Sequence, residues 1–161
     1  YYNIIVKLHG FSWEQKRYKY QNLLFTKMAK ENKNIKLIPN EIFDIIPYYK
    51  IADILVSDIS STMYEYLPLN RPIIQAECYT LRLKHRIFPN RFWKRLDIKR
   101  LRDLDFAYKI SNPEVLFSRI YYALDNLDEM QTQREKACNY YLYKNDGKAS
   151  HRLIKAIKDY K

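Results

Sequence analysis

The sequence is poor in cysteine and in long apolar runs. Its 2 cysteines, Cys78 and Cys138, lie far apart and form no Cys-x-x-Cys pair. This pattern favours free thiols in a reducing compartment. No Cys/His cluster has metal-ligand spacing, so we expect no metal site, and no cofactor is indicated. No apolar run approaches the ~18 residues that a membrane-spanning helix needs, and no signal peptide is visible.

Positive charge, in contrast, is abundant. The 161 residues include 29 Lys and Arg against 18 Asp and Glu, a formal net charge of +11. This excess favours polyanionic partners such as nucleotides, phosphate polymers, nucleic acid or an anionic membrane surface. The alternative is a solvated, lysine-rich surface without such a partner. The length suits one domain with a hydrophobic core. Because the chain begins with Tyr1 rather than Met, we expect a fragment of a longer protein.

Predicted strands alternate with predicted helices over the first two thirds of the chain. The strands are expected at 2–8, 34–38, 52–56, 71–76 and 105–110, and the helices at 14–31, 40–51, 62–69, 113–126, 128–143 and 148–160. Such alternation predicts an α/β fold, with a Rossmann-like parallel sheet and flanking helices in a single domain over residues 1–161. Ligands of these sheets bind at the carboxyl ends of the strands.

The most informative segment is the turn that follows the predicted strand 52–56. It reads Ser57-Asp58-Ile59-Ser60-Ser61 and leads directly into a helix. The hydroxyls of Ser60 and Ser61, with the backbone N–H groups of Ser61 and Thr62, could hold a diphosphate at the helix start. A carboxylate would repel that anion, so Asp58 is expected to orient the turn by accepting backbone N–H groups. The alternative is an ordinary helix cap.

Two further polar residues follow predicted strands. His9 precedes Gly10, whose missing Cβ is expected to give the backbone freedom there. Its imidazole could pair with a phosphate or perform acid–base chemistry. Glu77 follows the strand 71–76, where an acidic residue commonly accepts hydrogen bonds from ribose hydroxyls. The alternatives are a turn histidine and a solvated loop acid.

A basic segment, 82–102, interleaves Arg and Lys with aromatic residues. It could hold a phosphate-rich acceptor, lie on anionic lipid or bind nucleic acid. The candidate contact residues are Arg91, Trp93, Lys94 and Arg95. The alternative is a charged loop. No recognised RNA- or DNA-binding signature is present.

Several motifs together resemble the CDP-glycerol glycerophosphotransferase family, the teichoic acid primases and polymerases. The central match is Ile51-Ala52-Asp53-Ile54-Leu55-Val56-Ser57-Asp58-Ile59-Ser60-Ser61-Thr62-Met63-Tyr64-Glu65-Tyr66, followed by Asn70-Arg71-Pro72-Ile73-Ile74. Lys7-Leu8-His9 and Asp146-Gly147-Lys148-Ala149-Ser150-x-Arg152 are similar to two further family elements. The chain departs from the family at Gly10, usually proline, at Ile59, usually tyrosine, and over residues 78–110, which match poorly.

The resemblance implies one half of a GT-B fold, in which two Rossmann-like domains face a cleft. This chain would be the C-terminal, donor-binding half, which binds donor but needs the N-terminal half for turnover. Ser60 and Ser61 would contact the phosphates of CDP-glycerol or another nucleotide-diphosphate donor, with His9 near them as the candidate catalytic residue.

The acceptor implied by the resemblance is a phosphate-containing or lipid-linked polymer. A cytoplasmic location, peripheral at the inner face of the cell membrane, is expected for such an enzyme, and it makes acceptor or membrane contact the favoured function of the basic segment. Two alternatives remain: a nucleotide-sugar glycosyltransferase of the same fold, and a noncatalytic basic module that binds nucleic acid or membrane.

Overall fold

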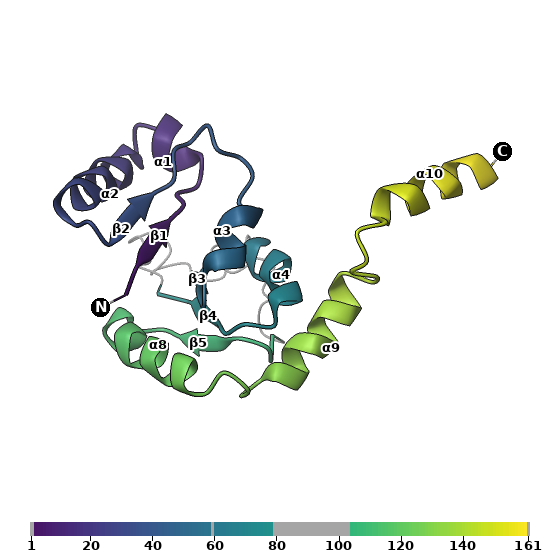
Figure 1. The fold of residues 1–161 in the computed structure, drawn as a ribbon. Helices are drawn as coiled ribbons and strands as arrows, with labels where there is room; N and C mark the ends of the chain where they lie inside the picture. The colour runs from purple at the N-terminus through teal and green to yellow at the C-terminus, as the bar shows by residue number, and fades with distance from the viewer. Residues whose placement is uncertain (1, 59, 79–103, 161) are drawn as a thin grey trace, which may run out of the picture. The chain divides into compact units, whose positions relative to one another are not determined.

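The computed structural model describes residues 2–58, 60–78 and 104–160. They form a mixed α/β structure with parallel sheets and flanking helices (Figure 1). The chain divides into two compact units, Tyr1–Ala52 and Asp53–Lys161, which we describe in turn. The single domain expected over residues 1–161 stays a prediction.

The first unit contains a two-stranded parallel sheet. Strand β1 (Ile4–Val6) pairs with β2 (Ile35–Leu37), and the helices α1 (Phe11–Glu14) and α2 (Lys19–Glu31) connect them. Helix α3 (Ile46–Ile51) follows β2 and has a proline in its first turn. The prediction of one helix over 14–31 is wrong, because Gln15 adopts an extended conformation that ends α1. No glycine or proline marks this break in the sequence.

The second unit contains a three-stranded parallel sheet in the order β3-β4-β5. The strands are β3 (Leu55–Ser57), β4 (Ile73–Ala76) and β5 (Tyr108–Ile110). Helix α4 (Thr62–Tyr66) and the 3-10 helix η1 (Leu67–Leu69) lead from β3 to β4. The predicted helix 62–69 is therefore two elements, and η1 has a proline in its first turn.

The chain after β5 is helical. The 3-10 helix η2 (Pro113–Val115) leads into α8 (Leu116–Asp125), which is followed by α9 (Gln131–Tyr141) and α10 (Ala149–Asp159). The side chain of Asn112 accepts a hydrogen bond from the N–H of Glu114 at 3.0 Å. This contact confirms the helix start that the polar residue and following proline predict.

The two faces of the β3-β4-β5 sheet differ in chemistry. Ile74, Tyr108 and Ile110 pack with Ala123 of α8 to form a buried cluster on one face. Successive side chains of a strand point to opposite faces. The register, in which Gln75 lies opposite both Ser57 and Lys109, therefore places a polar row on the other face.

Arg134 of α9 joins three segments of the second unit. Its side chain is 1% exposed, and burial lowers the pKa of its guanidinium. The guanidinium donates to Asn70 Oδ1 at 3.0 Å and to the carbonyl oxygens of Glu129 and Leu127 at 2.8 and 2.7 Å. Asn70 adopts a left-handed conformation (φ 50°) and donates from Nδ2 to Glu135 at 2.9 Å. These bonds fasten the approach to β4 onto α9.

Candidate functional site

The turn after β3 brings several hydroxyl groups together at the carboxyl end of the strand. Ser57 Oγ and Thr62 Oγ1 lie 2.9 Å apart and share a hydrogen bond. Ser60 Oγ accepts a long bond from the N–H of Thr62, at 3.4 Å. Ser61 occupies the N-cap position of α4, but its exposed side chain makes no capping hydrogen bond. Among the described residues, the hydroxyls of this turn are therefore only partly used by the fold, and phosphate binding by them stays a prediction.

Asp58 is exposed at the end of β3. We expected its carboxylate to accept backbone N–H groups and so to orient the turn. Among the described residues, the hydrogen bonds between hydroxyl groups and to hydroxyl groups in this turn involve Ser57, Ser60 and Thr62. The orienting role of Asp58 stays a prediction.

A second polar pair lies at the carboxyl end of β4. The backbone N–H of Glu77 donates to the carbonyl of Ile110 at 2.7 Å, which extends the pairing with β5 by one residue. Gln75 Nε2 donates to Glu77 Oε1 at 3.1 Å. Gln75 is fully buried, and the residues that the structure describes offer its Oε1 no hydrogen-bond partner. The half-buried carboxylate of Glu77 is thus held by an amide that lies inside the protein.

The turn and the Gln75–Glu77 pair lie at the same edge of one sheet, as predicted. Ser57 lies opposite Gln75 in the parallel register, so their side chains are on the same face of adjacent strands. Adjacent strands are about 4.8 Å apart. Sequence reasoning selected Glu77 but missed Gln75, although an amide inside the apolar run Ile73-Ile74-Gln75-Ala76 was the available signal.

His9 belongs to the first unit and is exposed three residues after β1. Its Nδ1 accepts a hydrogen bond from the N–H of Phe11 at 3.1 Å, and the two rings are in contact, 4.5 Å between centroids. An accepting Nδ1 places the proton of the neutral ring on Nε2, which can then donate. The expected use of glycine's freedom is wrong, because Gly10 has ordinary helical angles (φ −49°, ψ −35°). A proline could adopt this φ.

Two other elements of the family pattern hold the chain together locally. Lys7 Nζ donates to the carbonyls of Pro39 and Ile42 at 2.9 and 2.7 Å and thereby ties β1 to the loop after β2. Arg152 Nη1 donates to both carboxylate oxygens of Asp146, at 2.7 and 2.9 Å. The hydrogen bonds from Arg152, and then from the N–H of Lys148, lower the pKa of Asp146.

The aromatic residues of the Tyr64-Glu65-Tyr66 element belong to the interior. Tyr66 is fully buried, and burial raises its pKa to about 12. Tyr64 packs edge-on against Tyr141 and Phe106, with ring centroids 4.7 and 6.0 Å apart. These contacts anchor α4, and so they support the turn that precedes it.

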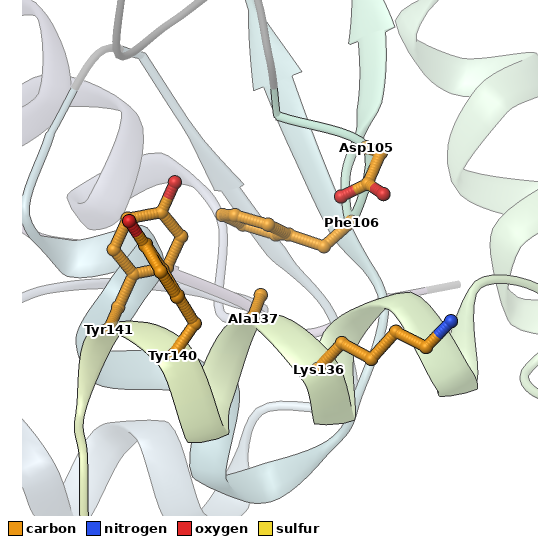
Figure 2. Close-up of a pocket in the computed structure, with 6 residues that line it drawn as sticks. All are labelled: Asp105, Phe106, Lys136, Ala137, Tyr140 and Tyr141. Carbon is orange, nitrogen blue, oxygen red and sulfur yellow. The ribbon is translucent and has the colours of Figure 1, made fainter.

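A surface cavity of about 360 Å³ borders this aromatic cluster. Figure 2 shows the ring of Phe106 extending toward two tyrosines of α9. The residues that line the cavity are Asp105, Phe106, Lys136, Ala137, Tyr140 and Tyr141. Asp105 and Phe106 precede β5, so this part of the cavity lining lies at the amino end of that strand. Sequence reasoning did not select these residues.

The basic segment 82–102, with Arg91, Trp93, Lys94 and Arg95, lies outside the described residues. Its contact with acceptor or membrane stays a prediction. Within the described ranges, every helix is too short or too polar to cross a membrane.

Comparison with known proteins bears on the whole length of the chain. The family model for CDP-glycerol:poly(glycerophosphate) glycerophosphotransferase matches residues 1–159. No match was found among curated proteins or among solved structures. The matched span includes both units and all the motifs described above. The chain therefore belongs to the CDP-glycerol:poly(glycerophosphate) glycerophosphotransferase family.

Proposed function

We propose that this chain is the donor-binding half of a GT-B transferase that moves glycerol phosphate from CDP-glycerol to a polymer acceptor such as poly(glycerophosphate). The family match supports the donor and acceptor classes. The observation that carries the proposal is the group of partly used hydroxyls at the carboxyl end of β3. Ligands of parallel α/β sheets bind at this edge.

The reaction would be a displacement at phosphorus. An acceptor hydroxyl attacks the donor phosphorus that carries glycerol and forms a new phosphodiester bond. The bond from this phosphorus to the bridging oxygen breaks, CMP leaves, and the hydroxyl proton is released. Most of the rate acceleration in such transfers comes from positioning and from stabilising the charge on the phosphate oxygens.

The serine turn would hold the donor phosphates. In this proposal, the hydroxyls of Ser60 and Ser61 and the backbone and side chain of Thr62 donate hydrogen bonds to phosphate oxygens. Ser57 supports Thr62 through their shared bond. A group that is already held by the fold, as the hydroxyl of Thr62 is, loses little freedom on binding, which favours affinity. Glu77, at the end of the next strand, would accept hydrogen bonds from the ribose hydroxyls.

His9 is the proposed catalytic residue of the chain. Because its Nδ1 accepts the N–H of Phe11, its neutral ring presents Nε2–H as a donor. This geometry favours a hydrogen bond to a donor phosphate oxygen rather than proton abstraction from the acceptor. The proton would then be removed by a base in the N-terminal half. The basic segment with Arg91, Trp93, Lys94 and Arg95 would contact the acceptor or the inner face of the membrane.

Titration calorimetry with CDP-glycerol tests the proposal. We expect binding by the wild-type chain and at least about a hundredfold weaker binding by the double variant S60A/S61A, since each hydrogen bond to a charged group is worth about 1.5–3 kcal/mol. S118A is the matched control, because Ser118 Oγ donates to the carbonyl of Val115 on α8. Its affinity should equal that of the wild type.

Two results would count against this assignment. Absence of heat with CDP-glycerol and with every other pyrophosphate nucleotide would remove the donor-binding function. Tighter binding of a UDP- or CDP-sugar than of CDP-glycerol would instead favour a nucleotide-sugar glycosyltransferase of the same fold.

A further inference from the structure

Gln75 is a polar side chain placed where an apolar one would be expected. It is 0% exposed and follows two isoleucines that are also fully buried. Within residues 2–58, 60–78 and 104–160, its Oε1 has no hydrogen-bond partner. A buried polar group without a partner destabilises the folded state, and an apolar side chain of similar size avoids that penalty. The fold alone therefore does not account for an amide at this position.

The other end of the amide has a defined contact. Gln75 Nε2 donates to Glu77 Oε1 at 3.1 Å. The two residues are separated by one position in an extended segment, so their side chains lie on the same face of the sheet. The backbone of Glu77 is fixed independently by its bond to the carbonyl of Ile110. Glu77 is thus held both at its backbone N–H and at its carboxylate.

We propose that Gln75 is a positioning residue, which fixes the Glu77 carboxylate as an acceptor for the adjacent 2′- and 3′-hydroxyls of the donor's ribose. This inference rests on the proposed donor-binding function. An amide suits the task because it is neutral and orients the carboxylate without forming an ion pair. The full negative charge of Glu77 then remains available to the ligand.

The geometry of the carboxylate agrees with recognition of a diol. Gln75 occupies Oε1, and the described residues give Oε2 no partner. Each carboxylate oxygen has two lone pairs, so Oε1 can accept one hydroxyl in addition to the amide while Oε2 accepts the other. The Ser57–Thr62 turn lies on the neighbouring strand, which puts phosphate and ribose contacts along one edge.

The test compares two nucleotides that differ by one hydroxyl. Calorimetry with CDP and with 2′-deoxy-CDP gives the ratio of their dissociation constants for each variant. We expect the wild type to prefer CDP at least about tenfold, the effect of one charge-assisted hydrogen bond. Q75L removes the amide donor and should bring the ratio close to one. E77Q, which weakens the acceptor, should lower it as well.

Two controls separate positioning from general stability. Q131L removes another amide that faces a carboxylate, Gln131 Nε2 to Glu135 Oε1 at 3.4 Å on α9, and should leave the ratio unchanged. S60A should weaken the binding of both nucleotides equally. Q75M, which is close to glutamine in length and has no donor, repeats the test if Q75L does not fold.

The experiment distinguishes a failure of the proposed donor-binding function from a failure of the proposed role of Gln75. A wild-type chain that binds no cytidine nucleotide contradicts the donor-binding proposal itself. A wild type that binds CDP and 2′-deoxy-CDP equally, or a folded Q75L that keeps the wild-type ratio, overturns the role of Gln75 alone. Unfolding of both Q75L and Q75M would also overturn it, since Gln75 would then be a residue of the fold.

Discussion

Arg134 and Gln75 are both buried polar residues of the second unit, but they use their polar atoms in opposite ways. The guanidinium of Arg134 donates to one side chain and two backbone carbonyls. In the described part of the chain, the side chain of Gln75 makes one hydrogen bond, to Glu77, and its amide oxygen Oε1 has no partner. The first arrangement connects α9, the 127–129 segment and the approach to β4. The second holds one carboxylate at the edge where ligands of such sheets bind.

The comparison suggests a way to distinguish buried polar residues that stabilise the fold, such as Arg134, from one proposed to serve ligand binding, Gln75. Where each polar group of a contact is satisfied, the contact itself explains the residue. Where one group remains unsatisfied, as for Gln75 Oε1 among the described residues, the contact alone does not explain the residue, and this is the ground for the positioning role proposed above. At the surface, the carboxylate of Asp146 accepts hydrogen bonds from Lys148 and Arg152, whereas Ser61 at the start of α4 makes no capping bond.

Substitution of Arg134 should have the largest effect on stability. R134M keeps much of the apolar stem but leaves Asn70 Oδ1 and the carbonyls of Glu129 and Leu127 without their donor. We expect the free energy of unfolding in urea to fall by about 3–5 kcal/mol, a large part of the total for a small domain. A loss below about 1 kcal/mol would mean that the three contacts are easily replaced by water, and would remove the contrast with Gln75.

Substitution of Gln75 should change stability far less. Q75L removes an unsatisfied carbonyl, which is favourable, and one hydrogen bond to a half-buried carboxylate, which is unfavourable. The two effects nearly cancel, so the unfolding free energy should stay within about 1 kcal/mol of the wild type. Urea denaturation of Q75L and R134M under the same conditions makes the comparison direct. If Q75L lowered the free energy of unfolding as much as R134M does, Gln75 would be a residue that stabilises the fold, like Arg134.

Protonation of Asp146 should have the smallest effect. Hydrogen bonds from Arg152 lower the pKa of this carboxyl. A carboxyl whose folded pKa is depressed adds stability above its unfolded pKa, about 3.9, and this contribution is lost as the pH falls through the folded value. The start of α10 should therefore loosen below about pH 4. NMR of the Asp146 carboxyl carbon measures the titration, and R152A should move it upward; an unchanged midpoint would contradict the pairing.

The positions of the strands follow from the sequence because they depend on short apolar runs. All five predicted strands of the described chain appear, each shorter than expected, and β3 ends one residue later than predicted, at Ser57. The break at Gln15 could not be foreseen, because no glycine or proline marks it in the sequence. The two separate sheets were likewise not evident from alternation alone, which does not specify which strands pair.

The candidate site could be predicted only in part. Ser60, Ser61 and Glu77 follow apolar runs, and a strand end can be located from such runs. The buried amide of Gln75 and the buried guanidinium of Arg134 could not be assigned to the interior from residue type, because glutamine and arginine are mostly exposed in proteins. Their partners are set by strand register and by contacts between segments that are far apart in the sequence.

Asn70, which has a left-handed backbone conformation, precedes β4 and helps to fix where Glu77 lies at the other end of the strand. Its side chain is hydrogen-bonded to both Arg134 and Glu135, and these bonds fix the chain just before the strand begins. An extended strand has little conformational freedom. Each residue advances the chain by about 3.3 Å, in the direction set by pairing with the neighbouring strands. An error in placing Asn70 would be carried along the strand to Glu77. The position of Glu77 at the carboxyl end of β4 therefore depends in part on contacts made before the strand begins.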